Sequence, residues 1–318
     1  MTAIGRVTHD GLRLCGPPEL VRILRGVVWL VLALVVLAIA ASFHPMVRNV
    51  ARAIRPSDHV DSAPPPVPDL ADPAVLVFSK TNGFRHDEAI ARGVPALAEI
   101  AARREWGFFH TENGAVFDTP VLDSVRVLVW FCASGAPLSG DQREAVRAWI
   151  EGGGGFVGIH AALDGSHASW EWYQRNVIGA DFTGHPIEHP EVVIRVERPE
   201  HPAMKGLPSP WARRDEWYSW ARSVRGDEGV EVLASLDESM YEPRMKLLWI
   251  DQDLTMGDHP IIWTRTVGQG RAFLSALGHT GASYSEPEHL AVLESGIAWA
   301  GQFGVAEDSG EAHPGAAE

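Results

Sequence analysis

The stretch "GGGGFVGIHAALDGSHASWEWY", residues 152–173, decides the fold. Its glycines lead into "FVGIHA", a short apolar run typical of a buried strand in a parallel sheet. The glycines come after an expected helix and before this strand, which favours a helix-ending turn. His160 stands at the end of the strand, and open parallel sheets bind ligands beyond that end. The stretch therefore predicts an α/β fold with His160 at its functional edge.

Similar apolar runs surround this strand. Helical patterns separate the earlier runs. One covers residues 87–104. Another begins after Ser139, which has with Gln142 the spacing of a capping box. The later runs have few helices between them, so they extend the sheet or add antiparallel strands. We expect a mostly parallel sheet with helices on both faces. The expected strands are "AVLVFSK", "WGFFHT", "RVLVWFC", "FVGIHA", "EVVIRVE", "EWYSWA", "VEVLASLD", "IIWTRTV" and "GRAFLSAL".

Composition and charge exclude some partners. The chain has 318 residues, a hydrophobic content of 46% and a formal net charge of −14. Phosphate recognition needs clustered positive charge, so nucleic acid is not an expected partner. The cysteines, Cys15 and Cys132, lie on opposite sides of an apolar segment. This placement argues against a disulfide between them and against a cysteine-based zinc site.

That apolar segment lies near the N-terminus. After a short basic segment, residues 1–25, residues 26–47 contain no Lys, Arg, Asp or Glu. About twenty apolar residues span a bilayer as a helix. We expect a single-pass transmembrane helix and, from a slight bias of flanking arginines, an extracytoplasmic folded domain. The alternatives are a buried core helix and a signal peptide cleaved near "AIA" at residues 38–40.

Three segments follow the apolar one. Residues 48–73 are rich in proline, which fixes φ and removes a donor, so they predict an extended, semi-rigid linker. Residues 74–304 form the expected folded domain. Residues 305–318 have the composition of a disordered acidic tail.

Several histidines follow the expected strands. Arg85 and His86 follow the first strand, His160 the fourth and His279 the last. Because the carboxyl ends of parallel strands meet at one edge, these loops should converge. His185 precedes a proline and is a further candidate for this edge. Imidazole ligands suit zinc or manganese, so His86, His185 and His279 are candidate ligands of a divalent metal.

The central stretch also resembles two other kinds of site. Gly153, Gly155 and Gly158 match a dinucleotide-binding fingerprint, but that fingerprint needs glycines after a strand and at the start of a helix. "GIHAA" resembles the strained turn that exposes a hydrolase nucleophile. A histidine there suits acid/base chemistry better than acyl transfer. Cys132 leaves a cysteine-dependent hydrolase open, although a strand-end cysteine is more often part of the core.

Carboxylates and aromatic side chains come together in "RRDEWYSW", residues 213–220. Asp215 and Glu216 are adjacent, so on a strand they would face opposite ways and only one would enter a site. Aromatic side chains offer flat apolar faces that suit sugar rings, and they equally suit a core. The candidates for substrate contact are Trp170, Trp172, Trp217 and Tyr218.

The order of motifs resembles one known family, the ThuA-like (trehalose utilisation) family. The resemblance covers roughly residues 74–303. Each motif alone is weak, but their common order is specific. They are "FSKTNGFRHD", "GGGGFVGIHAA", "WYQRNVIGADFTGHP", "HPAMKGLP", "DEWY", "GQGRAFLSALGHT" and "GIAWA".

The resemblance implies a flavodoxin-like fold related to class I glutamine amidotransferases. Those relatives carry a cysteine at the elbow where this chain has His160, so amidotransferase activity is not expected. The family is linked to disaccharide metabolism and keto-sugar derivatives. The residues that match its motifs are Arg85, His86, His160, His185, Asp215, Glu216 and His279.

These observations lead to a functional hypothesis. We expect a membrane-anchored protein that acts on a sugar or keto-glycoside by acid/base elimination, isomerisation or hydrolysis, with a divalent metal as a further option. His160 would be the acid/base, Glu216 or Asp215 the second proton-transfer group, and Arg85 would orient a substrate oxygen. The alternatives are a non-catalytic carbohydrate-binding or scaffold domain at the membrane and a hydrolase that uses Cys132. The sequence does not predict the oligomeric state.

Overall fold

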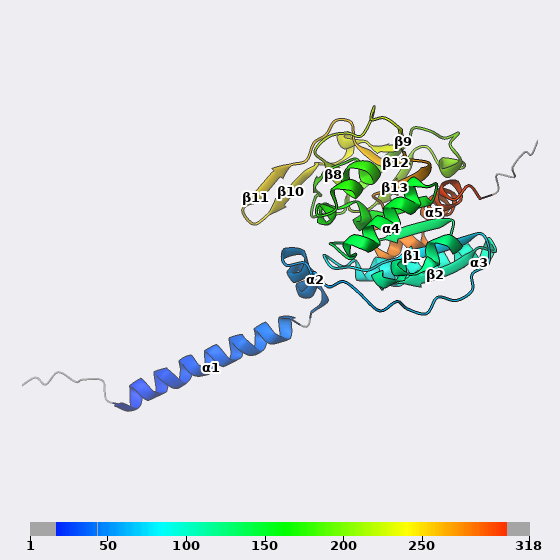
Figure 1. The fold of residues 1–318 in the computed structure, drawn as a ribbon. Helices are drawn as coiled ribbons and strands as arrows, with labels where there is room; N and C mark the ends of the chain where they lie inside the picture. Colours follow the sequence, from blue (N-terminus) through cyan, green and yellow to red (C-terminus); the bar gives the residue numbers. More distant parts are fainter. Residues whose placement is uncertain (1–16, 43, 304–318) are drawn as a thin grey trace, which may run out of the picture. The chain divides into compact units, whose positions relative to one another are not determined.

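The computed structural model describes residues 17–42 and 44–303, and the chain divides into two units, Met1–Ala51 and Arg52–Glu318 (Figure 1). The first unit contains α1 (Pro17–Ser42) and most of α2 (Pro45–Ile54). Cys15, most of the expected N-terminal segment and the expected tail at 305–318 lie outside the described residues.

Helix α1 contains a stretch, Val21–Ile39, that is long and apolar enough to cross a membrane. None of this stretch is buried, so the alternative of a core helix does not hold. A membrane span and a signal sequence both fit such a helix near the N-terminus. The helix ends at Ser42 rather than at the expected residue 47, and α2 occupies the first part of the expected linker.

The second unit is built on a nine-stranded mixed sheet with the order β2-β1-β3-β4-β13-β12-β9-β6-β7. The first five strands in this order are parallel, as the apolar runs predicted. All residues of β1, β3 and β4 are buried, which fits a sheet covered on both faces. The bounds of the parallel strands are β1 (Ala74–Phe78), β2 (Gly107–Thr111), β3 (Val127–Phe131), β4 (Gly155–Ile159) and β13 (Gly270–Ser275).

The other half of the sheet is antiparallel, one of the two arrangements expected for the later strands. Each strand pairs antiparallel with its neighbour from β13 onward, so β9 and β7 run in the same direction as β13. We call the edge at which β1, β3, β4, β13, β9 and β7 end the carboxyl edge. The bounds are β12 (Pro260–Val267), β9 (Val230–Leu236), β6 (Glu191–Val196) and β7 (Trp211–Arg214). Two small sheets pair β5 (Phe182–Gly184) with β8 (Ser219–Trp220) and β10 (Arg244–Leu247) with β11 (Ile250–Asp253).

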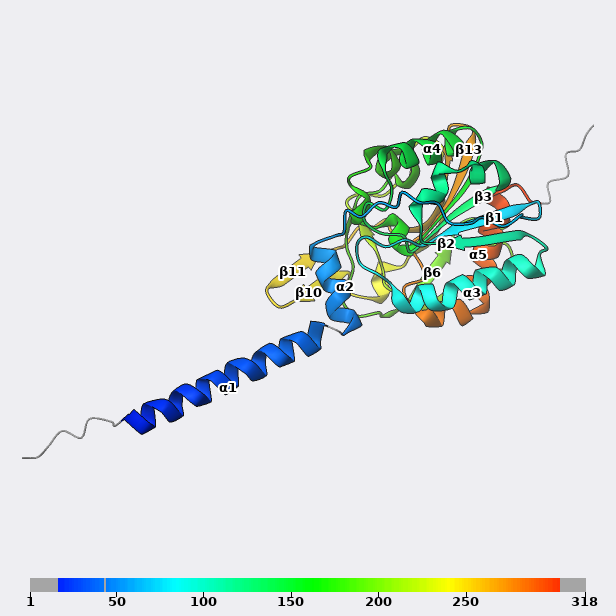
Figure 2. The same ribbon diagram turned by 60° about the horizontal axis from the view of Figure 1, so that its bottom comes forward.

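Helices cover both faces of the sheet. Figure 2 shows α3 (Asp87–Arg103) and α5 (Pro287–Ala300) on one face and α4 (Gly140–Glu151) on the other. Ser139 and Gln142 form the expected capping box at the start of α4. The helix ends at the expected glycine turn, where Gly153 has φ of +118°. After β4 the chain forms a π-helix at Tyr173–Ile178.

The extended linker is attached to the folded unit. No helix or strand forms between Arg55 and Pro73, as the prolines predicted. Ser57 donates its backbone N–H to the Asn82 carbonyl, at the carboxyl edge beyond β1. The Asp61 carboxylate accepts hydrogen bonds from Lys80 and from the backbone N–H of Gly114. The segment is therefore held against the carboxyl edge.

Candidate metal centre

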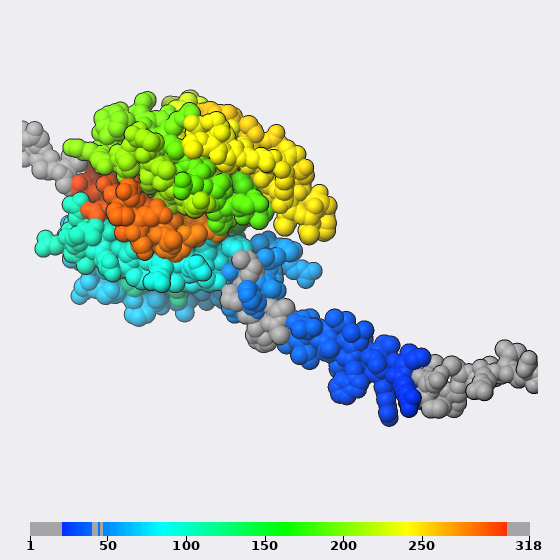
Figure 3. All heavy atoms as spheres, turned by 180° about the vertical axis from the view of Figure 1, so that it is seen from behind, coloured from blue at the N-terminus to red at the C-terminus, as the bar shows by residue number. Residues whose placement is uncertain are grey.

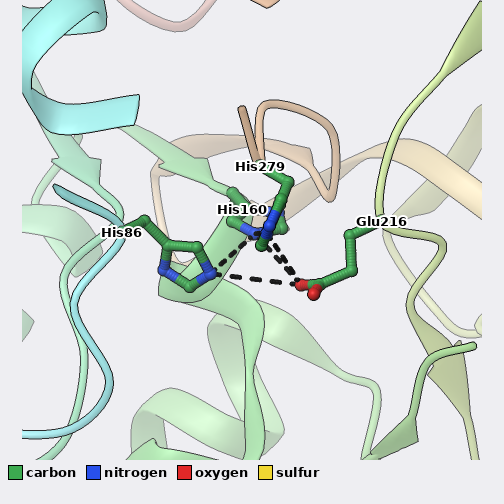
Figure 4. Close-up of side chains that lie close together, drawn as sticks. All are labelled: His86, His160, Glu216 and His279. Atoms are coloured by element: carbon green, nitrogen blue, oxygen red, sulfur yellow. Dashed lines mark hydrogen bonds and ion pairs between the residues drawn. The ribbon is translucent and has the colours of Figure 1, made fainter. Parts of the chain in front are cut away.

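Four side chains meet at the carboxyl edge of the sheet. His86 follows β1, His160 follows β4, His279 follows β13 and Glu216 follows β7. These strands all end at the same edge, so residues far apart in the sequence come together. Figure 4 shows the four side chains pointing toward a common centre.

The ligand atoms of this cluster lie at contact distance. His160 Nε2 is 3.1 Å from His86 Nε2 and 3.2 Å from His279 Nδ1. Glu216 Oε2 is 3.1 Å from His279 Nδ1, 3.4 Å from His160 Nε2 and 4.0 Å from His86 Nε2. One ligand atom of each residue lies within 4.8 Å of all the others.

The hydrogen bonding of His160 favours a cation at the centre. Its Nδ1 is 2.9 Å from the Ala276 carbonyl, which can only accept, so Nδ1 carries the proton. In the neutral ring Nε2 then presents a lone pair to two other imidazole nitrogens and a carboxylate. Tetrahedral zinc places its nitrogen ligands about 3.3 Å apart, close to the observed separations. The four side chains could therefore bind a divalent metal.

The local backbone explains how His160 reaches this position. His160 has φ of +53°, a left-handed conformation that is strained for a residue with a side chain. The chain turns sharply there into a 3₁₀ helix, His160–Leu163. The backbone at this position therefore has the sharp, strained turn of a nucleophile elbow, although the residue is a histidine.

Burial and charge shift the protonation of the cluster. Burial and the neighbouring His160 lower the pKa of His86 well below its ordinary value, so this ring is neutral. Burial acts against ionisation of Glu216, but its hydrogen-bonding contacts with His160 and His279 lower the pKa of its carboxyl well below the usual range. For His160, burial acts to lower the pKa, and the hydrogen bond and charge of Glu216 raise it on balance. The cluster thus combines a carboxylate with imidazole nitrogens.

Asp215 supports the cluster without entering it. Its carboxylate accepts the backbone N–H groups of Gly278 and His279 and pairs with Arg213. The expected strand over "EWYSWA" is confined to Ser219–Trp220, because these hydrogen bonds take residues 215–218 out of a ladder. The contacts of Asp215, and not the alternation of side chains along a strand, therefore keep its carboxylate out of the cluster that Glu216 enters.

Other polar side chains surround Glu216. His185 Nε2 is 3.3 Å and His189 Nε2 is 4.0 Å from Glu216 Oε1. The side chains of His185 and His189 are 28% and 34% exposed, whereas that of His160 is fully buried. Tyr218 stacks on His160, and its hydroxyl lies 3.3 Å from Nε2. His185 is thus next to the cluster, as expected, but outside the four closest ligands.

His189 was not among the candidates named from the sequence, and Tyr218 was expected only to offer an aromatic face to a sugar ring. A signal for His189 was present, since "GHPIEHP" repeats the histidine–proline pair of His185. The position of Tyr218 against His160 depends on the turn after Glu216, which has no local signal.

The structure does not bring the other candidates to the cluster. Arg85 pairs with Glu112 and Asp87. Trp170 stacks on Tyr173 in the core, and the indole N–H of Trp172 donates to Glu151 at the end of α4. Trp217 is fully buried, with its indole N–H on the Pro190 carbonyl. Trp170 and Trp217 therefore lie in the protein interior, whereas Trp172 is half-buried beside α4.

The burial of Cys132 does not suit an activated nucleophile. It is fully buried, and burial raises the pKa of its thiol far above the ordinary value. A thiolate nucleophile needs an accessible and positively charged environment. The environment of Cys132 therefore does not favour a cysteine-dependent hydrolase.

Comparisons with known proteins agree with this architecture. A family model described as "Trehalose utilisation" (ThuA) matches residues 74–300. A ThuA-like protein from Bacteroides uniformis superposes with a TM-score of 0.62 at 21% identity, covering 75% of this chain and 95% of that chain. A ThuA-like protein from Parabacteroides merdae superposes with a TM-score of 0.54 at 18% identity, covering 72% of this chain and 90% of that chain.

A search of curated proteins finds no match. The structural likenesses, at these identities, concern the fold. The family model covers most of the described folded unit, including all four residues of the cluster. The chain belongs to the ThuA (trehalose utilisation) family.

Proposed function

We propose that this protein is a metal-dependent enzyme that acts on a sugar or keto-glycoside derivative. One observation carries the proposal: three imidazole nitrogens and a carboxylate oxygen converge within 4.8 Å in a buried site. Buried polar atoms with so many lone pairs facing one another are stable only with protons or a cation among them. The carbohydrate substrate follows from the family description and is the expectation stated from the sequence.

The proposal assigns metal binding to His86, His160, His279 and Glu216. Imidazole and carboxylate ligands suit zinc or manganese. Such an ion supplies Lewis-acid polarisation of a substrate carbonyl or hydroxyl oxygen. His160, expected from the sequence as the acid/base, becomes a ligand in this proposal, because its only free nitrogen faces the centre.

Proton transfer then falls to the more exposed histidines. His185 Nδ1 lies 2.8 Å from the Pro186 carbonyl, so it carries a proton and leaves Nε2 free to exchange one. Nε2 is held beside Glu216 Oε1. In a keto-glycoside, the proton removed would be the one on the carbon next to the carbonyl, and His185 would take it. The electron pair of the broken C–H bond would then expel the oxygen on the next carbon, which takes up a proton, in an elimination; in an isomerisation His185 would return the proton at a neighbouring carbon.

The N-terminal helix α1 adds a location to the proposal. We propose that it is an uncleaved single-pass anchor and that the folded unit is extracytoplasmic. Its length and apolar composition support a span. Flotation of the full chain with membranes after a carbonate wash tests the anchor. Recovery in the soluble fraction, with α1 removed, would support a cleaved signal peptide instead.

The experiment for the enzyme proposal combines metal analysis with turnover. Protein purified without added metal should hold about one equivalent of zinc or manganese and should convert a member of a keto-glycoside panel. His160→Ala should lose metal and turnover together. His185→Ala should keep the metal and lose turnover. His201→Ala, which removes the cap of the 3₁₀ helix Pro202–Met204, is the matched control and should keep both.

Three results would contradict the proposal. Metal below about a tenth of an equivalent with turnover intact would exclude a metal role. Sugar binding that survives His160→Ala, with no turnover of any keto-glycoside, would support the non-catalytic domain. Loss of turnover in Cys132→Ser with metal retained would support the cysteine-dependent hydrolase.

A further inference from the structure

The tip of the β10–β11 hairpin is an exposed apolar surface. Leu247, Leu248, Trp249 and Ile250 are consecutive, and their side chains are 47%, 85%, 87% and 40% exposed. Figure 3 shows the hairpin, in yellow, standing out from the folded unit. Single exposed apolar residues are common, but four in a row at a protruding turn indicate a binding surface. We name residues 247–250 the apolar tip.

The apolar tip emerges from the carboxyl edge of the sheet. β9 ends at this edge with Leu236, and β12 begins there with Pro260, since Ile262 pairs with Ser275 at the end of β13. The hairpin lies in the excursion between these two strands. It also contacts the surroundings of the metal centre, because Gln252 Nε2 donates to the Thr183 carbonyl beside β8.

The chain that leads from α1 reaches the folded unit at the same edge. Ser57 and Asp61 are hydrogen-bonded to residues that follow β1 and β2. From Ser42, where α1 ends, to Ser57 the chain spans about 50 Å even if fully extended. The helical α2 shortens this reach further. The chain length therefore limits the separation between a bilayer that holds α1 and the point at which the chain joins the carboxyl edge to about 50 Å.

We propose that the apolar tip inserts into the interface of the bilayer that holds α1, so that the carboxyl edge faces the membrane. This inference rests on the proposed anchor and not on the proposed chemistry. Trp and Leu suit the boundary between headgroups and acyl chains. The charges near the tip are paired, Lys246 with Glu242 and Arg244 with Asp251, so insertion depends on apolar area and not on anionic lipid.

Helix α2 fits the same interface. Its exposed apolar residues include Val47, Val50 and Ile54, and it carries Arg48 and Arg52. A short helix with apolar and basic sides suits the plane of a bilayer surface. In this proposal α1, α2 and the apolar tip all contact the membrane.

The test uses the full chain in phosphatidylcholine vesicles. An environment-sensitive fluorophore is attached to Leu248→Cys and, as a matched control, to Gln269→Cys in the exposed turn between β12 and β13 at the opposite edge of the sheet. We expect the label at position 248 to emit at shorter wavelength in vesicles and to be quenched several-fold by lipids with brominated acyl chains. The label at position 269 should be unaffected.

Several outcomes would overturn the inference. A label at position 248 as solvent-exposed as that at 269, with the full chain bound to vesicles, rejects insertion while leaving the anchor intact. Protection of position 248 without lipid quenching would indicate a protein partner or a second copy at the tip, and it also rejects insertion. Metal content and turnover, measured on the same labelled protein, report separately on the proposed enzyme.

Discussion

Two regions of this protein invert the usual distribution of polar and apolar residues. The metal centre buries two histidines and Glu216 and leaves His279 partly exposed, whereas the apolar tip exposes Leu248 and Trp249 almost completely. Buried ionisable groups and exposed apolar clusters are both costly for an isolated chain. The first region is organised by hydrogen bonds that Asp215 and the Ala276 carbonyl accept, and the second by little more than a two-stranded hairpin.

This difference indicates what kind of partner each region suits. A pre-organised, rigid set of nitrogen and oxygen ligands suits a small cation with strict geometry. A protruding apolar turn without packing partners suits a soft, non-directional environment such as a bilayer interface. The following predictions test whether the two regions differ in this way.

The largest effect is expected for loss of a metal ligand. Glu216→Ala removes the carboxylate of the cluster and should weaken metal binding by about 4 kcal/mol, or roughly a thousandfold. Glu294→Ala, which removes a surface ion pair with Arg103 and Arg104, is the control and should leave the affinity unchanged. Metal-competition titration measures both. Equal affinities of the two variants would remove Glu216 from the site.

A pair of tryptophan substitutions compares the interior with the apolar tip. Trp170→Ala should destabilise the folded unit by about 3 kcal/mol, because it opens a cavity beside Trp130 and Tyr173. Trp249→Ser should change the free energy of unfolding by less than about 0.5 kcal/mol. Denaturant unfolding of both variants tests the contrast. A large loss of stability in Trp249→Ser would show that the tip serves folding.

The support given by Asp215 should have an intermediate effect. Asp215→Asn removes one acceptor for the N–H groups of Gly278 and His279 and the buried charge partner of Arg213, which keeps only its ion pair with Glu286. We expect metal affinity to fall by about 10–100-fold, as for other outer residues of metal sites. Calorimetric titration with zinc gives the value. An unchanged affinity together with unchanged stability would show that the His279 loop does not need this carboxylate.

The smallest effect concerns the linker segment after α2, which is held against the carboxyl edge by Ser57 and Asp61. Burial acts against ionisation of Asp61, but hydrogen bonds from Lys80 and Gly114 outweigh it and lower the pKa of its carboxyl below 3.8, with His59 also adjacent. Its contribution, about 1 kcal/mol, is present above pH 4 and is lost as the pH falls through the lowered pKa.

Proteolysis of residues 55–63 should therefore accelerate in acid. Asp61→Asn should show the fast rate at neutral pH as well, whereas the exposed Asp58→Asn should behave as the unchanged protein does. A neutral-pH rate for Asp61→Asn equal to that of Asp58→Asn would show that the Lys80 ion pair does not hold the segment.

Much of the fold could be predicted from the sequence because its signals are local. Fully buried strands such as β1 and β4 appear as unbroken apolar runs, and the box of Ser139 and Gln142 marks the start of α4. The placement of His86, His160 and His279 at one edge follows from the direction of the strands. These positions could be predicted without knowledge of side-chain packing.

The roles of individual side chains depended on long-range contacts and could not be predicted in the same way. Glu216 rather than Asp215 enters the cluster because the Asp215 carboxylate is taken by the Gly278 and His279 backbone, more than sixty residues away. Trp170 and Trp217 are of a residue type that suits a sugar site, but they lie in the interior. The linker prolines predicted extension but not the docking of Asp61 on Lys80.

Anomalous X-ray diffraction at the zinc and manganese absorption edges, on crystals of protein purified without added metal, tests the central claim most directly. We expect a single strong peak about 2.0–2.2 Å from His86 Nε2, His160 Nε2, His279 Nδ1 and Glu216 Oε2. The absence of a peak among these atoms, or a metal bound only elsewhere on the chain, would contradict the metal centre.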